Sequence, residues 1–215
     1  MMKRISMMLL LLVGFATVVS AQNKATAILA EVTKKYKSYD VVKADFTLTI
    51  NNPKANIKQT EKGTLYVKAN ANKYKMTTAD RDLLSDGKTQ WTYLKDDQEV
   101  QVTDVDQSAD ALNPAQIFTM YQKGYAATYA GENKVGNKSY QLIDLKPTSA
   151  GKSYSKVRLN IDNVSRQIAS MQVYDKNGGT YVYRITSFAP NVKVPETTFS
   201  FDAKKHPGVE VVDLR

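Results

Sequence analysis

Most of the chain from residue 44 onward alternates between apolar and polar side chains, and this period of two restricts its fold more than any other feature. In the first run, Ala44, Phe46, Leu48 and Ile50 are separated by Asp45, Thr47 and Thr49. Such alternation predicts β-strands that bury one face. Later runs carry Leu65 and Val67; Tyr74, Met76 and Thr78; Trp91 and Tyr93; Tyr140 and Leu142; Val157, Leu159 and Ile161; Ala169, Met171 and Val173; Tyr181, Tyr183 and Ile185; and Phe199 and Phe201.

Turn-forming residues separate these runs at intervals that suit antiparallel strands. Ser85-Asp86-Gly87-Lys88, Asp162-Asn163 and Asn177-Gly178-Gly179 are the clearest examples, and Gly87 is suited to a positive φ. The pattern gives about ten or eleven strands, more than a flat open sheet holds comfortably. We therefore predict a mainly β (α+β) fold, in which a strongly curved antiparallel sheet forms an incomplete barrel.

Two segments have helical spacing. In Lys24–Tyr39, the apolar residues Ile28, Val32 and Tyr36 recur on one side, which predicts an amphipathic helix. The second segment has an N-cap residue followed by proline, a favourable helix start, and ends before a glycine. It runs from Asn113-Pro114 to Gly124 and carries Ile117, Phe118, Met120 and Tyr121.

The first 21 residues have the features of a secretory signal peptide. Lys3 and Arg4 precede an apolar run, and Val19-Ser20-Ala21 supplies small residues at the expected cleavage site. A transmembrane anchor is the rival interpretation, but the apolar run is shorter than the roughly 20 residues that a span needs. We expect residues 22–215 to form a single domain.

Composition narrows the function classes. The chain has no cysteine, which excludes disulfides and thiolate chemistry, and its formal net charge is +9. Its lysines are scattered, so we interpret them as solvated strand faces, with no nucleic acid as partner. For an exported protein, such a surplus favours anionic membrane surfaces or acidic partners.

The chain offers few groups for catalysis. The single histidine, His206, lies between lysines and a proline, and we interpret it as a surface or turn residue. Asp104, Asp106, Ser108 and Asp110 resemble the start of a calcium loop, but Ala109 and Ala115 occupy positions where that loop needs glycine and a carboxylate. We therefore expect no metal, no cofactor and no enzymatic activity, which argues against a periplasmic hydrolase.

A sheet this large leaves an interior that its own side chains do not fill when it closes incompletely. If both helices cross the concave face, they cover an apolar pocket. An ordinary filled core is the alternative for any single residue. The predicted lining residues are Leu48, Leu65, Met76, Trp91, Tyr93, Ile117, Phe118, Met120 and Tyr121.

Four segments together resemble the LolA-like family of periplasmic carriers of outer-membrane lipoproteins. They are Gly63-Thr64-Leu65-Tyr66-Val67-Lys68, Leu84 to Tyr93 with its Ser-Asp-Gly-Lys-Thr-x-Trp-x-Tyr motif, the proline-led helix, and Phe199-Ser200-Phe201 with Pro207-Gly208-Val209-Glu210-Val211. The resemblance implies a half-barrel with a helical lid, whose apolar interior receives lipoprotein acyl chains. It departs from the family at Ala69-Asn70, where members commonly have Arg-Pro and the arginine helps to hold the lid closed.

The resemblance also implies partners and a location. We expect a monomeric periplasmic carrier that takes lipoproteins from an inner-membrane ATP-driven release complex and delivers them to an outer-membrane acceptor. The alternative is an envelope module that senses lipids or lipoproteins without transporting them.

Overall fold

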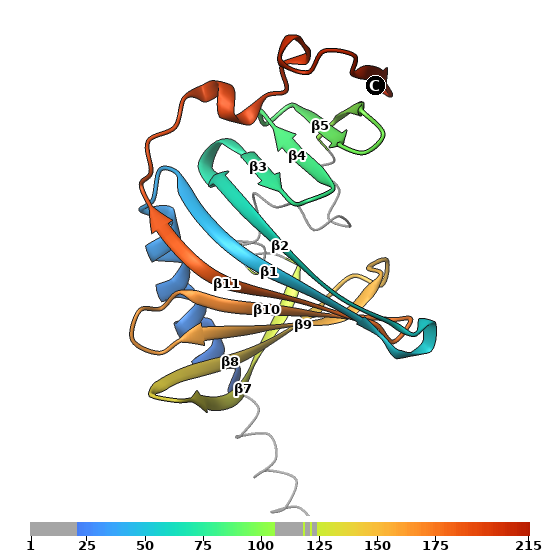
Figure 1. Ribbon diagram of the computed structural model, residues 1–215. Helices are drawn as coiled ribbons and strands as arrows, with labels where there is room; N and C mark the ends of the chain where they lie inside the picture. The colour runs from blue at the N-terminus through green and yellow to red at the C-terminus, as the bar shows by residue number, and fades with distance from the viewer. Residues whose placement is uncertain (1–20, 106–117, 119–120, 122–123) are drawn as a thin grey trace, which may run out of the picture.

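The computed structural model describes residues 21–105, 118, 121 and 124–215, and within them twelve strands form one sheet (Figure 1). The expected ten or eleven strands were too few, and the sequence had given no alternating run for β6, β7 or the short C-terminal strand β12. The order across the sheet is β12-β6-β5-β4-β3-β2-β1-β11-β10-β9-β8-β7. The bounds are β1 Val42–Asn52, β2 Ile57–Lys68, β3 Lys73–Thr77, β4 Arg81–Ser85, β5 Thr89–Leu94, β6 Glu99–Asp104, β7 Tyr125–Val135, β8 Lys138–Pro147, β9 Tyr154–Asp162, β10 Ile168–Asp175, β11 Thr180–Pro190 and β12 Glu210–Asp213.

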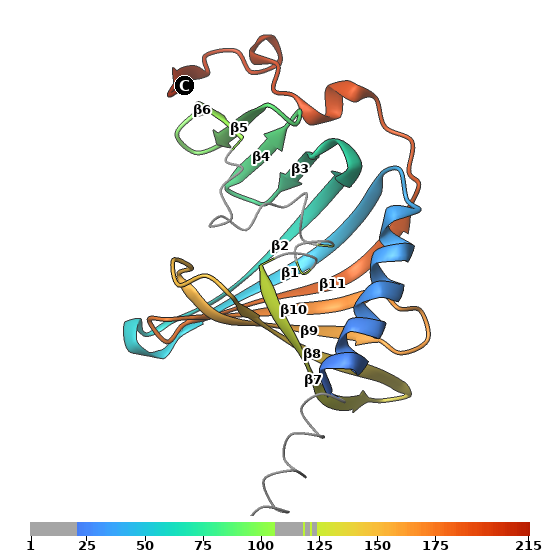
Figure 2. The ribbon, with the colours of Figure 1, turned by 180° about the vertical axis from the view of Figure 1, so that it is seen from behind.

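The sheet is strongly curved and open. Its end strands, β12 and β7, are not neighbours, and the strands β3 to β6 turn away from the long strands below them (Figures 1 and 2). Every pairing is antiparallel except that of β12 with β6. The predicted mainly β class and the open, curved sheet are therefore confirmed.

One helix, residues 21–37 of the described chain, crosses one face of the sheet (Figure 2). Its buried side chains include Ile28, Leu29, Val32 and Tyr36, which belong to the main hydrophobic core. The first predicted helix is thus confirmed. The second, from Asn113 to Gly124, lies outside the described residues apart from Phe118, Tyr121 and Gly124.

The turn between β9 and β10 fixes this helix to the sheet. Glu31 forms an ion pair with Arg166 at 2.6 Å, and the Lys35 ammonium donates a hydrogen bond to the Ser165 carbonyl. The Tyr36 hydroxyl accepts a hydrogen bond from the Ile168 amide at 3.1 Å, and burial raises the pKa of Tyr36 above its usual value. The helix is therefore held by polar contacts of Glu31 and Lys35 and by the buried hydrogen bond of Tyr36, in addition to its apolar contacts.

The strand register divides the sheet into two chemically different faces. On the face under the helix, here called the apolar face, Ala44 is paired with Leu65 and Phe188, and Phe46 with Ile185. The opposite face, here called the outer face, carries Asp45 and Thr47 on the same strand, because neighbouring strand residues point to opposite sides. The predicted alternation on β1 is confirmed.

The C-terminal arm, residues 191–215, corrects one sequence expectation. The segment around Phe199 and Phe201 is not a strand: Glu196–Phe199 forms the 3₁₀ helix η5, and Ala203–Lys205 forms η6. Pro195 precedes η5, and proline supplies no amide hydrogen for a strand ladder. Phe199 is only 1% exposed, so its apolar character serves burial in the core rather than strand alternation.

The turn between β4 and β5 depends on Gly87. Its φ is +96°, and the Asp86 carboxylate accepts hydrogen bonds from the amides of Lys88 and Thr89. A Cβ at Gly87 would lie 2.5 Å from the carbonyl oxygen of Ala71, in the 3₁₀ helix η2 (Ala69–Ala71). The glycine therefore allows this turn to pack directly against η2.

We expect Gly87→Ala to lower the free energy of unfolding by about 2–3 kcal/mol, because the left-handed backbone and the contact with Ala71 both oppose a Cβ. Gly136→Ala is the matched control: Gly136 has a φ of +58°, but a Cβ added there would have no atom within 4 Å, so the cost is about 1 kcal/mol. Urea denaturation measures both, and equal losses would contradict the close approach of Gly87 to η2.

Candidate functional site

The candidate site is the part of the apolar face that β11, β1, β2, β3 and β4 carry. Under the helix, Ile143 and Leu159 are fully buried. Farther across the sheet, Leu48, Met76 and Leu83 are only partly buried although they pack against the same core. The apolar face thus continues beyond the area that the described residues cover fully.

Register brings these side chains into two neighbouring groups. Leu65 is paired with Met76 and Met76 with Leu83, so three adjacent strands present apolar side chains in one row. Leu48 is paired with Tyr183 on β11, and burial raises the pKa of Tyr183. Leu48, Leu65 and Met76 were predicted as lining residues, and the structure places all three on the apolar face.

Phe118 and Tyr121, also predicted as lining residues, contact the N-terminal helix. The Phe118 ring stacks on Tyr36, with centroids 4.6 Å apart and planes at 9°. The Tyr121 hydroxyl accepts a hydrogen bond from Thr33 at 3.3 Å, and burial raises the pKa of Tyr121 to about 12. Both side chains are almost fully buried. The predicted Ile117 and Met120 lie outside the described residues.

Trp91 and Tyr93 do not lie on the apolar face, so the prediction that they share one pocket with Met76 was wrong. Met76 pairs with Leu83, and Leu83 pairs with Thr92. Trp91 and Tyr93 are the chain neighbours of Thr92 and therefore point to the outer face. The sequence showed correctly that Trp91 and Tyr93 share one face of a strand, but it did not show which face of the sheet this is. A register shift of one residue exchanges the two faces.

The aromatic side chain of Tyr93 instead anchors the C-terminal arm on the outer face. Its ring centroid lies 5.3 Å from that of Phe201 and 4.7 Å from that of His206. The rings of Phe201 and His206 are stacked, with centroids 4.7 Å apart and planes at 18°. His206, the C-cap residue of η6, is thus a packing residue in a turn.

Several residues of the candidate site were not predicted. Tyr181, Tyr183 and Ile185 were recognised as one strand face but not as part of the site, and Leu83 was not singled out. Their position follows from pairing, since Leu48 meets Tyr183 and Ile50 meets Tyr181. The signal in the sequence is the alternation itself; assigning a face also requires knowing which strands are neighbours.

Two further observations concern the described part of the chain only. None of its helices is long and apolar enough to cross a membrane. It also contains no group of three or more His, Cys, Asp or Glu residues that could hold a metal ion. Asp106, Ser108 and Asp110, from the considered calcium segment, are not among these residues.

Comparison with known families decides the relationship. The family model described as "Outer membrane lipoprotein carrier protein LolA" matches residues 37–202. The chain belongs to the LolA family. Members of this family are carrier or binding proteins rather than enzymes. No curated protein matches the sequence.

Solved structures share the LolA-family fold at low sequence identity. An uncharacterized conserved protein from Thermus thermophilus has a TM-score of 0.60 and 13% identity, and the match covers 88% of this chain and 99% of that one. A putative outer membrane lipoprotein-sorting protein domain from Vibrio parahaemolyticus has a TM-score of 0.52 and 12% identity, covering 83% and 97%. At these identities the similarity establishes the fold.

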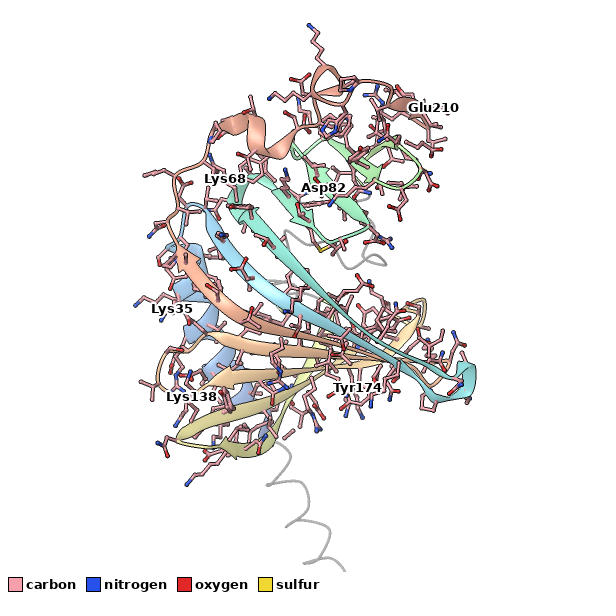
Figure 3. All side chains as sticks on the ribbon, viewed as in Figure 1. Lys35, Lys68, Asp82, Lys138, Tyr174 and Glu210 are labelled. Carbon is pink, nitrogen blue, oxygen red and sulfur yellow. The ribbon has the colours of Figure 1, made fainter. Side chains whose placement is uncertain are left out.

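Ala69 and Asn70, which replace the arginine and proline expected for the LolA family, lie in η2. On either side of η2, Lys68 and Lys73 each contact Glu196 of the C-terminal arm at 2.8 Å. Figure 3 shows Lys68 at the end of β2 next to this arm. Hydrogen bonds from the two ammonium groups lower the pKa of Glu196 to about 2. The η2 segment is therefore linked to the C-terminal arm.

We expect Glu196→Gln to loosen the arm at neutral pH, measured as faster trypsin cleavage after Lys193. The lowered pKa means that the contribution of the ionised carboxylate is present above the usual pKa of glutamate and is lost as the pH falls through about 2. Glu210→Gln is the control, since Glu210 forms no ion pair with another described residue. Equal cleavage rates in the two variants would show that Glu196 does not secure the arm.

Proposed function

We propose that this protein binds the acyl chains of lipoproteins on its apolar face and carries them through the periplasm from the inner to the outer membrane. The supporting observation is the presence of two partly buried groups, Met76 with Leu83 and Leu48 with Tyr183, on the apolar face of an open sheet. Membership of the LolA family supports the class of cargo. An ATP-driven release complex would supply the lipoprotein, and an outer-membrane acceptor would receive it.

The energetics explain how such a carrier works without a reactive group. Burying an acyl chain of about 16 carbons is worth on the order of 12 kcal/mol, at roughly 0.8 kcal/mol per methylene. When the acyl chain moves from one apolar site to another, the free energy lost at the first site is nearly equal to the free energy gained at the second. The transfer therefore needs little net free energy. The flexible side chain of Met76 suits a ligand of variable shape.

The direct test measures acyl binding and lipoprotein release. Native mass spectrometry should detect a complex with a diacylated lipopeptide, and the protein should release lipoproteins from spheroplasts into the medium. Leu48→Asp should weaken lipopeptide binding about tenfold or more, because it places a charge on the apolar face. Thr49→Asp, one residue along on the outer face, should bind normally.

The outcomes separate the alternatives. Lipopeptide binding without release from spheroplasts would favour a module that senses lipids or lipoproteins and does not transport them. Neither binding nor release would overturn the proposal.

The position of Trp91 permits a second test of which face binds. Because Trp91 is the only tryptophan and lies on the outer face, a brominated acyl chain, which quenches only on near contact, should leave its fluorescence unchanged. In the double variant Trp91→Phe with Leu83→Trp, the indole moves to the apolar face and should be quenched. If the acyl chain quenched Trp91 in the unaltered protein but did not quench the indole in the double variant, the ligand would lie on the outer face, which would contradict the proposal.

A further inference from the structure

The outer face contains a groove that acyl binding does not explain. It has a volume of about 490 Å³ and is lined by Asp45, Phe46, Thr47, Lys62, Gly63, Thr64, Thr77, Thr78 and Thr186. It lies across β11, β1, β2 and the end of β3, which are neighbours in the sheet (Figure 1). We call it the threonine groove. Of its lining residues, Asp45, Thr47, Lys62, Thr64 and Thr77 point by register to the outer face, away from Leu48 and Met76, whereas Phe46 and Gly63 belong to strand positions of the apolar face.

Two structural features open this groove. The strand β3 ends at Thr77, which pairs with Thr64, so no strand continues beside Lys62. On the other side, a bulge in the pairing of β1 with β11 leaves Thr186 without a partner in the register between Asp45 and Phe46. Bulges bend a strand and redirect its side chains, and they are frequent next to functional sites.

One end of the groove is cationic, because Lys62 lines it and Arg184, which is not a lining residue, lies beside it in the register. Thr47 is paired with Arg184 on β11 and with Lys62 on β2, so the two cations flank one threonine on the same face. Adjacent strands are about 4.8 Å apart, and these long side chains can therefore reach a single oxyanion above Thr47. Neither the Lys62 nor the Arg184 side chain has a hydrogen bond or ion pair with any other described residue.

The groove also has an anionic end, one row along the same strands. Asp45 is paired with Thr64, and its Oδ1 atom accepts a hydrogen bond from the Thr64 hydroxyl at 2.7 Å. No described residue donates to the other carboxylate oxygen, Oδ2. Asp45 and Lys62 share the groove without forming an ion pair. Opposite charges are thus both available, with threonine hydroxyls between them.

We propose that the threonine groove binds a phosphate ester that carries an ammonium group, the chemistry of phosphoethanolamine. The phosphate lies between Lys62 and Arg184, where guanidinium and ammonium groups both donate to its oxygens. The ammonium group lies at Asp45, and the hydroxyls of Thr47 and Thr64 complete the contacts. This site does not depend on acyl binding, because it is on the other face of the sheet.

The test titrates the purified protein with phosphoethanolamine and follows the amide NMR signals of Thr47, Thr64 and Thr77. Saturable shifts are expected, and Lys62→Gln or Arg184→Gln should weaken binding about tenfold, while Asp45→Asn weakens it about fivefold. Lys58→Gln is the matched control, because Lys58 is also exposed on the outer face of β2 but lies outside the groove. It should bind as the unaltered protein does.

Further ligands identify the chemistry. Inorganic phosphate, ethanolamine and a zwitterion with a carboxylate, such as γ-aminobutyrate, should each bind at least tenfold more weakly than phosphoethanolamine. Equal binding of any of these, equal weakening by Lys58→Gln, or absence of saturable shifts would overturn the proposal.

Co-sedimentation with phosphatidylethanolamine vesicles, but not with phosphatidylcholine vesicles, would identify a lipid head group as the source. Binding of the soluble ester alone would identify a free metabolite of the same chemistry.

Discussion

The pairing of β1 on both sides is the interaction on which the rest of the structure depends. This strand is paired with β2 from Val42 to Asn52 and with β11 from Val42 to Asn51. It therefore joins the first hairpin of the chain to the last long strand, and its register decides which residues face the helix. A shift by one residue would turn Ala44 and Phe46 outward and place Asp45 in the core.

The sequence predicted the strands better than it predicted their relations. The alternation at Ala44, Phe46 and Leu48 is local, so both the strand and its buried side were predictable. The face of Trp91 depends on the register of three successive hairpins, which no single run of residues encodes. Phe199 misled for another reason: it is buried as a strand residue would be, but it follows Pro195 in a 3₁₀ helix.

The two faces of the sheet use similar residue types for different purposes. Tyrosines such as Tyr183 are partly buried on the apolar face, whereas Tyr93 holds the C-terminal arm from the outer side. Composition alone cannot separate these roles, because both tyrosines lie in alternating strands. The separation matters for function: an acyl ligand on one face and a polar ligand in the threonine groove would be divided by a single layer of backbone.

The link between β1 and β11 has a consequence for how the chain folds. Val42 pairs with Pro190, so most of the chain must be synthesised before the central ladder can close. Contacts between residues so distant in sequence slow folding. Until β11 pairs with it, one edge of β1 keeps unpaired backbone groups, and these can pair with strands of other chains. The molecule should therefore pass through a prolonged, association-prone intermediate, in which chaperones that bind extended segments have time to act.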